Sequence, residues 1–454
     1  MKTWLNRIAY KIPRLNFIVS LLIIISICLS LHIRPDSEGR NKNFRRWYNC
    51  CSGQNLVLKL KGAPPGWYLD QGDDRGATLL TAACIALTVS DDKLSERIRT
   101  PPKIYNALLL MLHGTMLFIL YLAVYSLLGI GSAFGITMVC VFSGSLRFVL
   151  FGYDVYLFPF YAAVFLLAAF VLLPIRKPCS LILLGGCILG IGVCEFFRSG
   201  SCYVAFGFLI YALLYSWLGN GGSQRFTRML AVGCFMITIL LSMAPALFLG
   251  QRKHVVWHSL HAGLLEFGGF RDGCGRTYPS TIAINKLPGT AEKLTCWLDS
   301  YEIDYARKID SSVHLFTPGY ENILKNEVKR IALAYPRETL MLLMKRLWRF
   351  TLLNPWQPHD GSSLTLPSRA DPLIRIFLIA VVAAGIIIGL DRKVALMVFG
   401  LLPSALPPLL VHSGYIMYNL PGQLPLYILV ICSLNAIIMR TVKSFVEGLA
   451  SIKA

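Results

Sequence analysis

The sequence predicts an all-α polytopic membrane protein with about ten transmembrane helices and two large extracytoplasmic segments that carry surface helices. Of its 454 residues, 55% are hydrophobic and only 15% are charged. Its mean hydropathy of +0.58 is higher than that of a soluble domain. The apolar residues also come in runs of about 20, the length at which a helix crosses about 30 Å of hydrocarbon.

These runs set the expected spans, which lie at residues 15–33, 104–128, 134–151, 154–174, 179–198, 202–219, 228–249, 373–390, 394–411 and 417–439. The first run follows several basic residues, as a signal peptide would. It is too long for a signal-peptide core, however, and no small-residue cleavage site follows closely. We therefore interpret it as a retained membrane anchor.

Basic residues in the short loops predict the sidedness of the chain. With a cytoplasmic N-terminus, most loops on that side carry Lys or Arg, as the positive-inside rule expects. The residues are Arg176, Lys177, Arg225, Arg228, Arg392, Lys393, Arg440 and Lys443. Residues 34–103 and 250–372 then lie outside and both termini are cytoplasmic. The chain divides into an N-terminal transmembrane region, 1–249, the outer segment 250–372 and C-terminal helices in 373–454.

The net charge of +20 is spread over cytoplasmic loops and both outer segments. It forms no single basic stripe, so we expect membrane lipids and no nucleic acid as partners of this charge. Cys274 and Cys296 both lie in the outer segment, and the sequence does not decide whether they form a disulfide bridge. His254, His258 and His261 lack a carboxylate at metal-site spacing, so no metal site is expected, and they more often line a cleft or contact headgroups.

The first outer loop gathers acidic residues in the stretch GWYLDQGDDRGATLL, residues 66–80. Asp73 and Asp74 stand just before an apolar run, 76–90, that is too short to span and predicts a surface or re-entrant helix. Such carboxylates favour a helix N-terminus. Two interpretations remain open at this point: the acids cap the helix, or they carry chemistry.

Further along the outer segment lies the stretch YPRETLMLLMKRLWRF, residues 335–350. Its apolar residues share one helical face, and basic residues follow near the C-terminal end, which predicts an interfacial amphipathic helix. The apolar set is Leu340, Leu343, Met344 and Leu347, and the basic set is Lys345, Arg346 and Arg349. These cations meet either lipid headgroups in general or one lipid-linked phosphate.

Four charged residues of the predicted spans fall near outer ends: Arg147, Asp154, Glu195 and Arg198. Charge inside a membrane bundle is costly, by at least about 2.5 kcal/mol, so such residues usually face a polar cavity or each other. An internal pair of Glu195 with Arg198 is the structural alternative to a binding site.

This layout resembles the GT-C class of integral membrane glycosyltransferases, and in particular the bacterial branch akin to protein mannosyltransferases and lipid A aminoarabinose transferases. The matching stretches are GDDRGATLLTAACIAL, LGIGVCEFFRSGS, VVWHSLHAGL, YPRETLMLLMKRLWRF and SGYIMYNLPGQLPLYIL. The resemblance implies sugar transfer, with inversion, from a polyprenyl-phosphate-linked donor to a lipid, glycan or protein acceptor. It implies the outer face of a bacterial plasma (inner) membrane as the place of reaction.

The resemblance also implies roles for individual residues. Asp73 or Asp74 would be the catalytic base, since an attacking hydroxyl must lose its proton to a nearby carboxylate. The donor phosphate and substrate would contact Arg75, Arg198, His258, Lys345, Arg346, Arg349 and Tyr415. No cofactor is required by this chemistry, and the use of a divalent cation stays open. A polymerase or ligase of lipid-linked glycans and a lipid or ion transporter are the alternatives; the transporter is disfavoured because the sequence has no internal repeat.

The predicted sidedness leads to a labelling test. In intact cells, with native cysteines replaced, a membrane-impermeant thiol reagent should label a cysteine at position 310 and leave one at position 225 unlabelled. Cell lysis should expose both positions and serves as the control. Labelling of position 225 but not of position 310 would overturn the topology.

Overall fold

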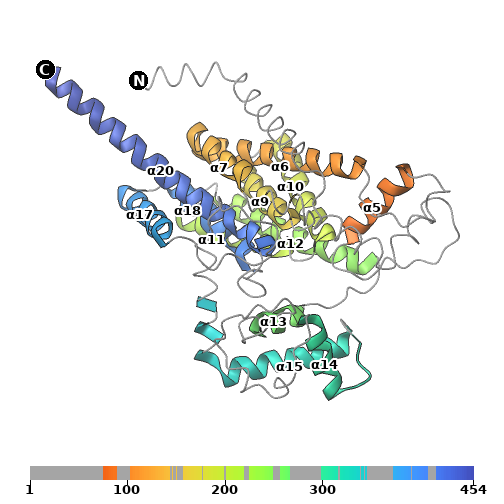
Figure 1. Ribbon diagram of the computed structural model, residues 1–454. Helices are drawn as coiled ribbons and strands as arrows, with labels where there is room; N and C mark the ends of the chain where they lie inside the picture. The colour runs from red at the N-terminus through yellow and green to blue at the C-terminus, as the bar shows by residue number, and fades with distance from the viewer. Residues whose placement is uncertain are drawn as a thin grey trace.

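The computed structural model of the 454-residue chain describes residues 75–88, 103–143, 146, 150, 157–175, 177–198, 201–218, 224–248, 256–265, 298–314, 317–337, 339–341, 343–344, 372–389, 391–406 and 416–453. Every regular element in these residues is a helix (Figure 1). The predicted all-α class is therefore confirmed for this part of the chain.

Residues 1–249 contribute α5 (Arg75–Thr88), α6 (Lys103–Leu128), α7 (Ile130–Phe142), α9 (Phe158–Leu172), α10 (Pro178–Phe197), the 3₁₀ helix η3 (Ser201–Ala205), α11 (Phe206–Leu218) and α12 (Gln224–Phe248). The rest of the chain contributes α13 (Val256–Leu265), α14 (Leu298–Ile309), α15 (Pro318–Ala334), α17 (Pro372–Ile388), α18 (Arg392–Leu401), the 3₁₀ helix η5 (Leu402–Ala405) and α20 (Ile416–Lys453).

Among the described helices, four are long and apolar enough to cross a membrane: Lys103–Leu128, Pro178–Phe197, Arg225–Met243 and Leu420–Glu447. Shorter apolar helices lie at Ile130–Phe142, Phe158–Leu172, Ser201–Tyr215 and Ile376–Ile388. These findings support a membrane protein. The number of ten spans, the first span at 15–33 and the outer location of both long segments stay predictions.

Several predicted spans differ in detail from the helices observed. The run 134–151 is shifted and interrupted, because α7 spans Ile130–Phe142 and Ser143 follows it with an extended backbone. The run 394–411 is interrupted, because α18 ends at Leu401 and η5 follows with Pro403 in its first turn. Proline has no N–H with which to continue an α-helical ladder. The run 417–439 continues as helix to Lys453, well past its apolar part. Lys443 and Glu447 pair there one turn apart, at 3.7 Å, which favours a helix on an exposed segment.

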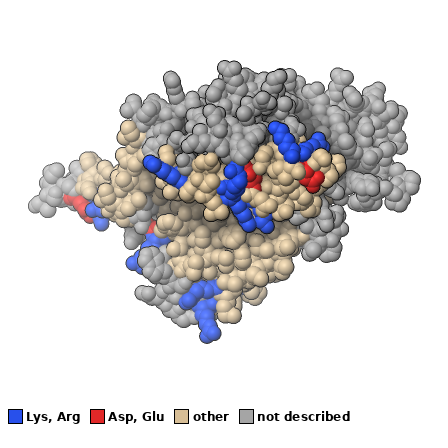
Figure 2. Space-filling model, turned by 90° about the horizontal axis from the view of Figure 1, so that it is seen from below, with Lys and Arg blue, Asp and Glu red and all other residues tan. Residues whose placement is uncertain are grey.

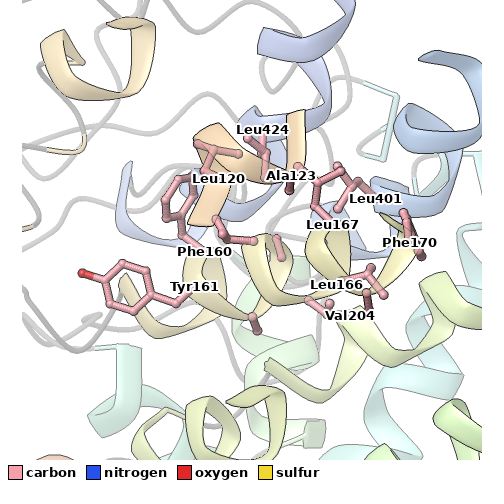
Figure 3. Close-up of a cluster of buried hydrophobic side chains, with 14 of the residues drawn as sticks. Leu120, Ala123, Phe160, Tyr161, Leu166, Leu167, Phe170, Val204, Leu401 and Leu424 are labelled. Atoms are coloured by element: carbon pink, nitrogen blue, oxygen red, sulfur yellow. The ribbon is translucent and has the colours of Figure 1, made fainter. Parts of the chain in front are cut away.

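Helix α9 forms the centre of the bundle and packs against α6, α10 and α20. It is apolar around its whole circumference, the pattern of a helix that is surrounded by others. Phe160, Leu167 and Phe170 are buried, and Figure 3 shows them beside Leu120 of α6 and Leu401 of α18. The helices that contact α9 are thus arranged around one apolar helix.

Glycines let several helices approach closely. A Cβ added to Gly207 of α11 would clash with the carbonyl oxygen of Gly400 in α18, and one added to Gly385 of α17 would clash with Ser433 of α20. Lipid tails are as apolar as leucine, so helices in a membrane associate largely through such close packing. These contacts therefore fix how α11 meets α18 and how α17 meets α20.

The prolines of α20 leave backbone groups without helical partners. Pro425 has no N–H to donate to the carbonyl of Pro421. The Ser404 hydroxyl of η5 lies 3.0 Å from that carbonyl oxygen and 2.6 Å from the carbonyl oxygen of Leu401, and its hydrogen is shared between them. A serine on a neighbouring element thus satisfies the carbonyl that the proline leaves free.

The crossing of α11 and α18 yields a stability prediction. Gly207→Ala should destabilise the protein by about 1–3 kcal/mol, because the Gly400 carbonyl leaves no room for a methyl group. Gly185→Ala is the matched control, since a Cβ at Gly185 of α10 meets nothing within 4 Å. Thermal unfolding of both variants in detergent tests this, and equal melting temperatures would contradict it.

Candidate functional site

The predicted site residues divide between described and undescribed parts of the chain. Asp73, Asp74, Lys345, Arg346, Arg349 and Tyr415 lie outside the described residues, as do Arg147, Asp154, His254, Cys274 and Cys296. Arg75 is the first residue of α5, and its side chain is not described. Arg198 and His258 are described, and each lies in a separate polar cluster.

The first cluster lies where α5 meets the ends of α6 and α10. The helix predicted for residues 76–90 is present as α5, and its Leu80 and Cys84 pack with Tyr105 and Leu109 of α6. At its first turn, a Cβ on Gly76 would lie 2.7 Å from the Phe197 ring and 2.9 Å from the Phe197 Cα. Only glycine fits this approach, so the start of α5 is held against the C-terminal end of α10.

Arg198 follows Phe197, and both of its own backbone groups are hydrogen-bonded. Its N–H donates to the Cys194 carbonyl at 2.9 Å, and its own carbonyl accepts from the Ser201 hydroxyl at 3.1 Å. The Glu195 carboxylate accepts from the Cys202 N–H at 2.8 Å and closes the turn. Both Glu195 and Arg198 are buried. These hydrogen bonds therefore hold the backbone on both sides of a buried arginine.

An aromatic layer connects this turn with the middle of the bundle. The ring of Phe197 stacks on Phe158 of α9, with centroids 4.2 Å apart, and Phe158 meets Tyr161 edge to face. The Tyr161 hydroxyl lies 3.0 Å from Nδ1 of His113 on α6. The tautomer of the histidine decides which group donates. α5, α6, α9 and α10 thus meet through one continuous set of contacts.

The second cluster holds α13 to α15. Glu321 of α15 is only 4% exposed, and its two carboxylate oxygens accept from the N–H groups of Trp257 (2.8 Å) and His258 (3.0 Å). These are N–H groups of the first turn of α13, which lack partners within the helix. Nδ1 of His258 lies 2.7 Å from the Tyr320 hydroxyl. A negative charge thus caps a helix N-terminus from a distant part of the chain.

The same cluster contains an ion pair and a stacked histidine. Glu327 bonds Arg330 through both carboxylate oxygens, at 2.6 and 2.8 Å. Burial raises the pKa of Glu327, but hydrogen bonds from Arg330 and Tyr305 outweigh it and hold this pKa below its usual value. The hydrogen bonds with Glu327 raise the pKa of Arg330. Tyr305 of α14 stacks on the buried His261 of α13. Polar contacts therefore join all three helices.

Sequence reasoning missed most of these partners. His113 stands in the middle of a predicted span, and an ionisable residue there is a signal that could have been read. Glu321 and Glu327 carried no such signal, because Glu321 acts on backbone groups more than sixty residues away in the chain. The described residues contain no group of three or more His, Cys, Asp or Glu that could hold a metal ion.

Comparison with known proteins leaves the family open. No family model matches the chain, and no curated protein or solved structure matches it. The functional argument therefore rests on the residues and their geometry.

The Glu321 cap yields a prediction about α13. Glu321→Ala should cost about 2 kcal/mol of local stability, because two buried N–H groups lose their acceptor. Hydrogen exchange in the full-length chain should then be faster at the amides of Trp257 and His258. Glu321→Gln keeps one acceptor oxygen and should show a smaller effect.

Glu447→Ala provides the control for this experiment, since it removes an exposed carboxylate from α20. It should leave exchange in α13 unchanged. If Glu321→Ala exchanged like this control, the carboxylate would not be what holds the start of α13.

Proposed function

We propose that the chain is a membrane glycosyltransferase that takes a sugar from a polyprenyl-phosphate-linked donor. The acceptor is a lipid, glycan or protein at the extracytoplasmic face of a bacterial plasma membrane, and both termini are cytoplasmic. The proposal rests on two supports. The first is the resemblance of the sequence to GT-C transferases, and the second is the arrangement of residues at the C-terminal end of α10.

One observation carries the proposal. The first turn of α5, which directly follows Asp73 and Asp74 in the sequence, packs on Phe197, the neighbour of the buried Arg198. This contact supports a proposal in which the carboxylates that precede α5 act near the guanidinium of Arg198, at one end of the bundle. Sugar transfer from a lipid phosphate needs both kinds of group close together.

The chemistry assigns each group a task. As the acceptor hydroxyl attacks the anomeric carbon, a new C–O bond forms and the hydroxyl proton passes to Asp73 or Asp74 as general base. The bond from the anomeric carbon to the phosphate oxygen breaks, and the lipid phosphate leaves with the electron pair. Arg198 stabilises the charge that develops on that phosphate. A rigid turn favours this role, because a preorganised cation needs no rearrangement during the reaction.

Further contacts to the donor are assigned to the remaining predicted residues, Arg75, His258, Lys345, Arg346, Arg349 and Tyr415. In this proposal the basic end of 335–350 receives the phosphate from the bilayer surface. Arginine grips phosphate with two parallel hydrogen bonds, whereas lysine acts as a point charge, so the two are not interchangeable in such a site.

The general base is tested with asparagine substitutions. Asp73→Asn or Asp74→Asn should lower turnover about 10²-fold or more, because asparagine cannot accept the proton but still caps a helix. Purified protein is incubated with a panel of radiolabelled polyprenyl-phosphate sugars and membrane acceptors, and label transfer is followed.

Asp310→Asn serves as the matched control, since the Asp310 side chain is exposed in another part of the chain and accepts hydrogen bonds from the N–H and the hydroxyl of its neighbour Ser312. It should retain full activity. Near-normal transfer by both loop variants would remove this loop from the mechanism.

A further inference from the structure

Helix α15 has one face that is covered by its neighbours. Tyr320, Leu324, Glu327 and Ile331 are all buried and recur at helical spacing. This face packs against α13 and α14, which contribute Trp257, Ile303 and Tyr305 around it. The covered face therefore identifies the opposite side of α15 as the one that these helices do not reach.

A large apolar side chain lies on that opposite side. Leu333 is 82% exposed and stands two residues after the buried Ile331, which turns it about 200° around the helix. The exposed Lys329 precedes Leu333 by about one turn, and the exposed Arg337 follows it just beyond the end of α15. A leucine between two cations is the pattern of a helix face at a membrane surface.

The exposed apolar side chains continue past α15. Leu340 is 60% exposed, Met341 45% and Met344 57%. Single exposed apolar residues are ordinary on protein surfaces. Four of them lie within twelve residues of the sequence, with Arg337 among them, and together they expose apolar surface that water solvates poorly.

The charge of the neighbouring side chains indicates which kind of surface can cover these apolar residues. The described exposed charges that flank Leu333 along the chain include the cations Lys329 and Arg337. Helices α13, α14 and α15 lie lowest in Figure 1, and the view from below in Figure 2 shows Lys and Arg side chains, in blue, on the described surface. An anionic surface complements this charge.

We propose that Lys329, Leu333, Arg337, Leu340, Met341 and Met344, here called the α15 lipid face, lie on an anionic lipid bilayer. The apolar side chains enter the boundary between headgroups and acyl chains, and the cations contact lipid phosphates. We choose a bilayer as the partner because the same chain has helices that can cross one. Such helices keep this face close to the bilayer surface. The proposal extends the interfacial segment predicted at 335–350 to α15, and it does not depend on which reaction the chain catalyses.

Spin labelling of the full-length chain tests the lipid face. A cysteine-free variant that carries Leu333→Cys, Leu340→Cys or Lys308→Cys is labelled and reconstituted into bilayers of phosphatidylcholine with phosphatidylglycerol. Oxygen concentrates in lipid and a nickel chelate stays in water. The ratio of oxygen to nickel collisions should therefore be severalfold higher at 333 and 340 than at 308, which lies on α14.

Charge reversal separates lipid contact from simple proximity. Lys329→Glu combined with Arg337→Glu should lower the ratio at 333 toward that at 308, and so should bilayers of phosphatidylcholine alone. Neither residue lies in the core of the three helices, so the thermal unfolding of this variant should match that of the parent.

Two results would overturn the proposal. A ratio at 333 equal to that at 308 would place the face in water. Shielding of 333 from both reagents would show that protein, either another segment of this chain or a second copy, covers it instead of lipid. If a labelled variant fails to fold, Met344→Cys supplies the same measurement at another position of the face.

Discussion

The burial of α9 is the constraint on which the rest of the bundle depends. A helix that is apolar on every side can be satisfied only when other helices surround it, and α6, α10 and α20 do so. In a membrane, surrounding it brings no gain from excluding water, so the fit between surfaces must supply the stability. The aromatic rings of α9 and the glycines of its neighbours provide that fit. Gly190 of α10 and Gly400 of α18 each leave space for a phenylalanine ring of α9.

Buried charge is treated in the same way in both polar clusters. Glu195 and Glu321 each accept hydrogen bonds from backbone N–H groups at the start or turn of another element. A carboxylate in this position compensates part of its own desolvation and also satisfies a backbone donor that has no helical partner. The carboxylate therefore adds a polar link between two elements that also pack on each other. This explains how a polar residue remains in a chain with so few charges.

The parts of this fold that could be predicted from sequence are those that depend on local pattern. The runs 104–128 and 179–198 correspond to α6 and α10 within about a residue at each end, because hydropathy and length define a span locally. The run 76–90 appeared as α5 for the same reason. The end of α18 was missed, since Pro403 breaks a run whose hydropathy continues. The links from His113 to Tyr161 and from Glu321 to α13 depend on the path of the chain in space, and no local pattern encodes them.

The position of Arg198 follows from the same constraint that buries α9. Its turn is closed by Glu195, and the preceding Phe197 is stacked on Phe158, which belongs to the first turn of α9. Gly76 brings the start of α5 against the same phenylalanine. One ring thus has the central helix on one side and α5 on another. A displacement of α9 would move Phe197. Both the turn that carries Arg198 and the start of α5 would then shift, because each contacts or adjoins Phe197. The apolar packing of α9 therefore determines where the polar residues of the proposed site lie.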